Sequence, residues 1–272
     1  MSLKAKQSKN GKTANGLMFV AAGLFIVSLI WLAVIGWGYV SSALSYKNLG
    51  GPSGDAFPRA EHDARNGKVA ASVDFAKLRT INPDIVAWIS VPGTRISYPV
   101  VQGTDNHKYL KKMFDGSSGK YGSIFLDAKA DKNLTDDNVI VYGHHMRDGG
   151  MFHDFATFAT SAIYFKKHSV IYLETPDRLY KLDAISAYVV SGTAVLPQTF
   201  GSEEQLDGYL TRVLKRSRFA RNATVPVGGI TQLFTFATCS YQFDDARTVV
   251  TAIESSSWDI DRSAKIETSE TK

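Results

Sequence analysis

Short apolar runs separated by turn residues dominate the chain between residues 85 and 254. A succession of such runs is typical of β-strands and favours an antiparallel barrel or sandwich. The predicted strands are Ile85–Val91, Tyr98–Val101, Gly122–Leu126, Asn138–Tyr142, Val170–Glu174, Leu179–Leu182, Ile185–Val190, Gln232–Thr238 and Thr248–Glu254. We therefore expect a mainly β fold.

Helical patterns interrupt these strands at Asp74–Thr80, Met151–Phe158 and Ser202–Ser217. The first is expected to end near Asn82-Pro83, since proline cannot continue a helix. The longest begins with a capping serine, carries glutamates in its first turn and ends in basic residues, as a stable helix should. Its apolar stripe, which predicts packing against the strands, comprises Leu206, Leu210, Val213 and Leu214.

The uncharged stretch Leu17–Val40 is long enough to cross a hydrocarbon core of about 30 Å as a helix. Lysines precede it without any acidic residue, and such flanks stay in the cytoplasm. We therefore expect a single-pass protein of the cell membrane, with a cytoplasmic N-terminus and an extracellular remainder. A cleaved signal peptide, with Ser41 and Ala43 near the cleavage site, is the alternative, but the apolar run exceeds the usual ~7–15 residues.

These patterns predict a division of the chain. Its parts are a basic cytoplasmic tip at 1–16, a transmembrane signal-anchor at 17–40, an extracellular stalk at 41–68, a β-domain at 69–255 and a polar tail at 256–272. The net charge is +5, but Lys4, Lys6, Lys9 and Lys12 belong to the tip, so the outer domain is close to neutral. No basic stripe with interleaved aromatic residues occurs, which argues against nucleic acid as a partner.

The chain has one cysteine, Cys239, at the end of a predicted strand. A single cysteine cannot form an internal disulfide, so it is a buried apolar side chain, an intermolecular disulfide or a reactive thiol. A reactive thiol needs a nearby base or cation.

His144 and His145 are the histidines best placed to be that base. They follow the predicted strand at Asn138–Tyr142 in a glycine-flanked loop, where a rigid scaffold can present a side chain. Adjacent strand residues point to opposite faces, so the pair is not expected to chelate one metal ion. The histidines that we expect to be structural or exposed are His62, His107, His153 and His168.

Arg247 precedes the last predicted strand. Its spacing alone indicates a surface salt bridge to Asp244 or Asp245. The alternative is a fixed cation beside a thiolate or a developing oxyanion.

Taken together, several segments resemble the sortase family, and its class B in particular. TFATC at 235–239 is similar to the family's TLxTC signature, with Phe236 in place of leucine and Ala237 at the variable position. Four further features of this chain resemble class B sortases. They are the segments YGHHMRDGGMF, WISVPGTRISYPVVQGTDNHKYL and YGSIFLD and the helix at 202–217. The resemblance covers roughly residues 70–255.

The resemblance implies a closed, sortase-like β-barrel with short helices and one longer helix between late strands. No cofactor or metal is expected. It implies that Cys239 is the nucleophile, His144 the general acid and base, and Arg247 the donor to the substrate carbonyl or oxyanion. It also implies a groove for the sorting signal, lined by Asn106, Leu110, Tyr142 and Thr238.

By the same resemblance, the chain is expected to be a membrane-anchored cysteine transpeptidase of the peptidase class in Gram-positive bacteria. It would cleave an NPxTx-like sorting signal of a secreted protein through a thioester and transfer the protein to an amine of the peptidoglycan precursor. The alternatives are a pilin-polymerising sortase that uses a lysine, a hydrolytic thiol peptidase, and a non-catalytic tethered domain with an incidental cysteine.

Overall fold

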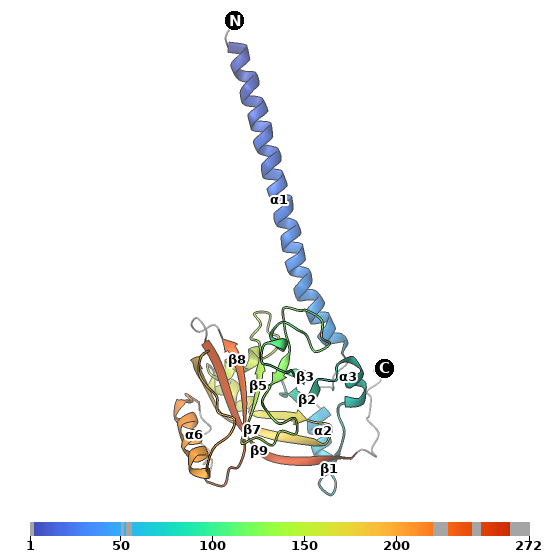
Figure 1. Cartoon of the computed structure of the whole chain (residues 1–272), viewed down its shortest axis with the longest axis vertical. Coiled ribbons are helices and arrows are strands. Elements are labelled where there is room, and N and C mark those ends of the chain that lie inside the picture. Colours follow the sequence, from blue (N-terminus) through green and yellow to red (C-terminus); the bar gives the residue numbers. More distant parts are fainter. Residues whose placement is uncertain (1–2, 50–51, 53–55, 220–227, 241–245, 262–272) are drawn as a thin grey trace. The chain divides into compact units, whose positions relative to one another are not determined.

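A computed structural model describes residues 3–49, 52, 56–219, 228–240 and 246–261 (Figure 1). The chain divides into two compact units, Met1–Ser45 and Tyr46–Lys272. The first unit consists of the greater part of α1 (Leu3–Asn48). By length and composition, Met18–Lys47 could cross a membrane, a longer stretch than the predicted 17–40.

The second unit contains a closed β-barrel. Its strands are β1 (Lys68–Ala70), β2 (Ile85–Ser90), β3 (Ser97–Gln102), β4 (Ile124–Leu126), β5 (Asn138–Gly143), β6 (Val170–Glu174), β7 (Arg178–Ser191), β8 (Leu233–Ser240) and β9 (Ala246–Asp261). They pair in the order β1-β9-β7-β6-β2-β3-β4-β5-β8, and a further β8–β9 pairing closes the ring. Most neighbours are antiparallel, whereas β3–β4, β5–β8 and β1–β9 are parallel. The predicted mainly β, closed barrel is confirmed.

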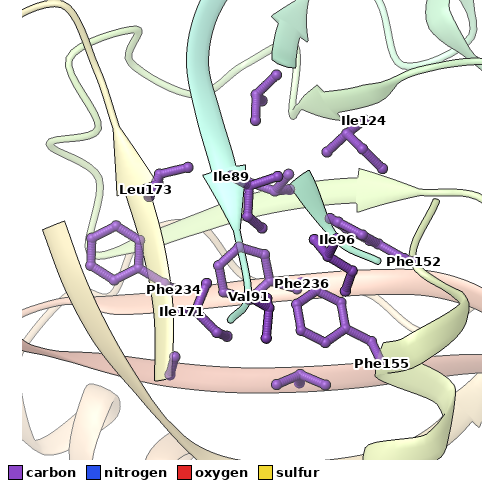
Figure 2. Close-up of a cluster of buried hydrophobic side chains, with 14 of the residues drawn as sticks. Ile89, Val91, Ile96, Ile124, Phe152, Phe155, Ile171, Leu173, Phe234 and Phe236 are labelled. Atoms are coloured by element: carbon purple, nitrogen blue, oxygen red, sulfur yellow. The ribbon is translucent and has the colours of Figure 1, made fainter. Parts of the chain in front are cut away.

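The barrel is filled by apolar side chains from strands that are distant in sequence (Figure 2). Ile89 and Leu173 come from β2 and β6, and Phe234 and Phe236 come from β8. Phe155 reaches the same cluster from α4 and lies 5.3 Å from Phe236 between ring centroids. Burying rings of this size contributes most of the stability of such a core, so the strand that contains Cys239 is firmly held.

The helices of this unit are α2 (Ala56–His62), α3 (Phe75–Ile81), η1 (Lys108–Leu110), α4 (His153–Phe158), α5 (Ala162–Lys167) and α6 (Glu203–Arg216). The capping serine predicted for the longest helix is confirmed, because Ser202 accepts a hydrogen bond from the backbone N–H of Gln205. The predicted stripe on α6 is confirmed as well. Its members Leu206, Leu210 and Val213 are buried, and Leu214 packs beside them.

The two strands predicted at Leu179–Leu182 and Ile185–Val190 are one strand, β7. Its pairing with β9 shifts register between Lys181 and Leu182 and again between Ala184 and Ser186. Each bulge changes the phase of the apolar alternation, so one long strand has the pattern of two short ones.

The polar tail was expected to begin at residue 256, but β9 continues to Asp261. Ser256–Asp259 pair with β7, and Asp259–Asp261 pair with β1. Trp258 and Ile260 are partly buried against an apolar cluster. Backbone pairing with β7 and then with β1 holds this polar stretch in the sheet, and composition does not report such pairing, so it predicted the end of the strand too early. Residues 262–272 lie outside the described residues.

The predicted stalk at 41–68 is largely helical in its described residues. α1 extends to Asn48, and α2 occupies Ala56–His62. Phe57 is completely buried and stacks on Tyr172 at 5.8 Å. At least the part from Ala56 onward therefore packs on the barrel, because one aromatic residue anchors an otherwise polar segment.

Candidate active site

Three adjacent strands bring the predicted catalytic residues to one end of the barrel. β5 and β8 run parallel with Gly143 opposite Thr238, so the next residues along the two strands are His144 and Cys239. β8 and β9 run antiparallel, and Cys239 lies opposite Arg247 in their register. β5, β8 and β9 are neighbouring strands (Figure 1). Their register therefore places His144, Cys239 and Arg247 on or directly after adjacent strands.

Side chains buried in the β5–β8 pair stabilise this register. The hydroxyl of Thr235 donates to the amide oxygen of Asn138 at 2.7 Å, and neither residue is exposed to solvent. A hydrogen bond in such surroundings is costly to break, because it would leave a buried polar atom without a partner. A slip of one residue between the strands would therefore be unfavourable, and Gly143 and Thr238 remain paired.

The ring of His144 is held by a backbone carbonyl. Its Nε2 lies 2.7 Å from the carbonyl oxygen of Leu110. A carbonyl oxygen can only accept, so Nε2 must carry the proton and donate. In the neutral ring, Nδ1 is then the nitrogen with a free lone pair, and it is the one able to take up a proton during a reaction.

The ring of His145 has different surroundings. It stacks on His153 with 4.6 Å between centroids, and His153 in turn contacts the carbonyl of Met146 through Nδ1 at 2.9 Å. Burial, followed by the nearby His153, lowers the pKa of His145 below its ordinary value. His145 thus belongs to a packed histidine pair, whereas His144 contacts η1.

Asp127 joins two of the predicted groove residues. This carboxylate is 6% exposed, and its Oδ2 accepts hydrogen bonds from Nδ2 of Asn106 at 2.9 Å and from the hydroxyl of Tyr142 at 3.1 Å. Oδ1 of Asn106 accepts from the backbone N–H of Ala128 at 2.8 Å. Both ends of the Asn106 amide therefore have partners within the protein, which fixes its orientation.

The charge of Arg247 also influences the pKa of the Tyr142 phenol. Burial and then the Asp127 carboxylate raise the pKa of Tyr142, and the positive charge of Arg247 opposes this rise. Arg247 is partly buried on β9, which is separated from the β5 strand of Tyr142 by β8. Asp244 and Asp245, the partners of the predicted salt bridge, lie outside the described residues.

The four predicted groove residues lie on β5 or are connected to it or to His144 by a contact or a strand pairing. Leu110 is partly buried and contacts His144 through its carbonyl, and Thr238 is almost fully buried beside Gly143. Asn106 and Tyr142 meet on Asp127. Asp127 was not predicted, although it ends the motif YGSIFLD directly after the buried strand β4.

Two of the histidines expected to be structural or exposed have contacts of that kind. His168 is buried, and its Nδ1 lies 2.9 Å from the carbonyl of Pro92. His62 pairs with Asp63 at the surface. Among the described residues, no group of three or more histidine, cysteine, aspartate or glutamate side chains could hold a metal ion.

Comparison with known proteins identifies the family. A model of the sortase domain matches residues 89–255. Sortase B of Staphylococcus aureus is 33% identical over 181 residues, which is 65% of this chain and 73% of that protein. Sortase B of Listeria monocytogenes is 28% identical over 172 residues, covering 63% and 69%.

Solved structures agree. Sortase B from Bacillus anthracis in complex with AAEK1 superposes with a TM-score of 0.66 at 28% identity, covering 80% of this chain and 98% of that one. Clostridium perfringens sortase B gives 0.61 at 32% identity, covering 66% and 99%. The family match over more than half of the chain, together with these relatives, shows that the chain belongs to the sortase family of cysteine transpeptidases, class B.

Proposed function

We propose that this sortase anchors secreted proteins to the cell wall by transpeptidation at the outer membrane surface. It would cleave an NPxTx-like sorting signal after the threonine and join the new carboxyl end to an amine of the peptidoglycan precursor. The observation that carries the proposal is the register that sets Cys239 opposite Arg247 and beside the strand leading to His144.

The proposed reaction uses each of these residues once per half-reaction. The thiolate of Cys239 attacks the threonine carbonyl, and the carbonyl π electrons move to oxygen to give a tetrahedral oxyanion. Arg247 donates hydrogen bonds to that oxygen, where negative charge has developed. The oxyanion then collapses, the C–N bond breaks, and protonated His144 gives its Nδ1 proton to the leaving amine, which leaves a thioester.

The second half-reaction runs the same steps with a new amine. Neutral His144 takes a proton through Nδ1 from the incoming amine as it attacks the thioester carbonyl. Collapse of the second oxyanion expels the Cys239 thiolate and forms the new amide bond. Because Nε2 of His144 remains on the carbonyl of Leu110, the ring need not turn between the two steps.

Two relatives support the choice of substrates. One solved structure is a Staphylococcus aureus sortase B–substrate complex, and another is a sortase B complexed with triglycine. A short glycine peptide carries the primary amine that this proposal requires as acceptor. We propose that Asn106, Leu110, Tyr142 and Thr238 contribute to the groove for the sorting signal, with Asn106 and Tyr142 held by Asp127.

We also propose the membrane topology and division of the chain stated above for 1–16, 17–40 and 69–255. The apolar, exposed helix at Met18–Lys47 and the lysines before it support a single-pass anchor with the N-terminus in the cytoplasm. An anchor of this kind would keep the enzyme where exported substrates and lipid-linked wall precursors meet.

Peptide cleavage followed by mass spectrometry tests the proposal. The full chain in detergent is incubated with an NPxTx-like peptide, with and without triglycine. We expect a ligated product only when triglycine is present, and no product from Cys239→Ala. Equal amounts of hydrolysed peptide in both reactions would favour a thiol peptidase. Cleavage at the parental rate by folded Cys239→Ala would overturn the mechanism.

A further inference from the structure

Tyr46 is held firmly at the start of the second unit, near the end of α1. Its hydroxyl donates a hydrogen bond to the carbonyl oxygen of Gly122 at 2.7 Å. Its ring meets Tyr98 edge-on at 5.3 Å and is tilted against Phe114 at 5.0 Å. Rings packed at such angles and distances restrain one another, so the hydroxyl is held against the segment that contains Gly122.

Gly122 forms one side of the space that the His144 ring occupies. Its φ is +56°, and a Cβ atom there would lie 2.9 Å from Cδ2 of His144 and 2.7 Å from the carbonyl oxygen of Leu110. The Gly122 backbone therefore lies so close to the imidazole and to the acceptor of its Nε2 proton that no side chain would fit between them. A hydrogen bond from the N–H of Ser123 to the carbonyl of Tyr109, 3.0 Å long, keeps this segment against η1.

We propose that Tyr46 is a positioning residue for His144. By holding the carbonyl of Gly122, Tyr46 keeps the Gly122 backbone against the imidazole and keeps Nε2 aligned on Leu110, so that Nδ1 remains the nitrogen that exchanges protons. The inference rests on the acid–base role proposed for His144 and deepens it. Tyr46 acts through the Gly122 backbone and takes no part in the bond-making steps.

Removing the hydroxyl should loosen the ring of His144 without removing any group from the proposed reaction. Tyr46→Phe keeps the aromatic packing with Tyr98 and Phe114, so the variant is expected to fold. The Gly122 segment then loses the hydrogen bond from Tyr46, and the imidazole gains freedom to turn about its Cβ–Cγ bond. Neutral His144 would then populate both tautomers instead of only the one protonated at Nε2.

Two measurements on the full chain in detergent test this inference. In protein labelled with [15N]histidine, His144 signals are assigned by their loss in His144→Gln. We expect the signal of the Nε2 proton to weaken in Tyr46→Phe. We also expect kcat/KM for an NPxTx-like peptide to fall roughly tenfold, mainly through kcat, with a displaced histidine limb in its pH profile.

Tyr172→Phe is the matched control. Tyr172 is also a packed tyrosine, and its hydroxyl contacts Glu61. Its loss should leave the His144 signals and the pH profile unchanged. As a second variant, Phe114→Leu removes a ring that restrains Tyr46 and should change the His144 signals in the same direction as Tyr46→Phe, but by less.

Failure of the positioning role and failure of the proposed function give different results. Parental His144 signals and a parental pH profile in both Tyr46→Phe and Phe114→Leu would overturn the positioning role, even if His144 proves essential. Parental turnover in His144→Gln would overturn the proposed function. The ring signals would then still decide whether Tyr46 orients His144.

Discussion

The hydroxyl of Tyr142 donates a hydrogen bond to the buried carboxylate of Asp127, 3.1 Å away, and Asn106 donates to the same oxygen. Tyr142 immediately precedes Gly143 and His144, so this carboxylate stabilises the chain beside the proposed site, where His144 also contacts Leu110. Asp127 thereby fixes the side chains of two proposed substrate-binding residues.

Asp127→Asn should weaken peptide binding more than it slows the reaction. The amide keeps the size of the side chain but loses the charge and presents an N–H group to donors. One buried donor would remain unsatisfied, at a cost of about 1–3 kcal/mol in the free energy of unfolding. We expect KM to rise several-fold and kcat to change less, as measured by steady-state cleavage. Asp131→Asn, on an exposed turn in the same loop, is the control; equal KM values in the two variants would contradict this role.

His144→Gln and His145→Gln should have opposite effects on activity and stability. Loss of a general acid and base typically costs about 100- to 10,000-fold in rate, so His144→Gln should lose most of kcat/KM and remain folded. His145 packs on His153, so His145→Gln should lower the unfolding temperature and retain most activity. Enzyme assays beside thermal unfolding decide this, and reversed effects would assign the base to His145.

Arg247→Lys should bind peptide and turn it over slowly. Lysine keeps the charge but lacks the planar fork of donors that arginine presents to an oxyanion. Losing one such donor typically lowers kcat by about 100- to 1000-fold, and Arg247→Ala should lose more. Arg178→Ala removes an exposed arginine that faces Asp259 at 3.8 Å and should leave kcat unchanged. Near-parental kcat in Arg247→Ala would favour the surface salt bridge instead.

Glu174 should make the protein less stable as the pH rises toward neutral. This fully buried carboxyl accepts backbone hydrogen bonds from Ser72 and Val73, yet burial raises its pKa from 4.5 to about 7. Between these values the folded state binds the proton and the unfolded state has released it, so the contribution is largest below pH 4.5 and is lost as the pH passes 7.

Glu174→Gln should abolish this part of the pH dependence. The unfolding free energies of the parent and the variant, measured by denaturant at about pH 5 and pH 8, should differ in their pH response by an amount on the order of 3 kcal/mol. Glu203→Gln, on the exposed first turn of α6, is the control. An unchanged pH response in Glu174→Gln would show that the carboxyl is ionised throughout this range.

The barrel was predictable because most of its strands are short apolar runs that end at turn residues. Val170–Glu174 was predicted with its observed bounds, whereas bulges hid the continuity of β7. The helix α5 was missed because it has no apolar stripe: Phe165 is buried, but Ile163 is 83% exposed. The sequence feature that indicates this helix is its capping residue Ser161, whose side chain accepts a hydrogen bond from the backbone N–H of Tyr164.

At the proposed site, sequence reasoning selected residues through motifs and missed those that act through tertiary hydrogen bonds. Asp127 is 21 residues from Asn106 in sequence, and Tyr46 is 76 residues from Gly122. Periodicity describes neighbours within one strand or helix and contains no information about such distances. Periodicity also cannot identify the hydrogen-bond partner of His144, which is a backbone carbonyl, because every residue has one.

Because β9 closes the barrel, the order of synthesis determines when this enzyme can first act. β5 can pair with β8 only after β8 has been made, because the hydrogen bond between Asn138 and Thr235 joins residues that are 97 apart in sequence. β8 can in turn pair with Arg247 only after β9 has been made. Long-range pairings of this kind form late and slow the folding of a chain. Under the proposed mechanism, an incomplete copy that lacks its last strand would therefore have Cys239 but no assembled site, and it could not form a thioester with a substrate before its own chain is complete.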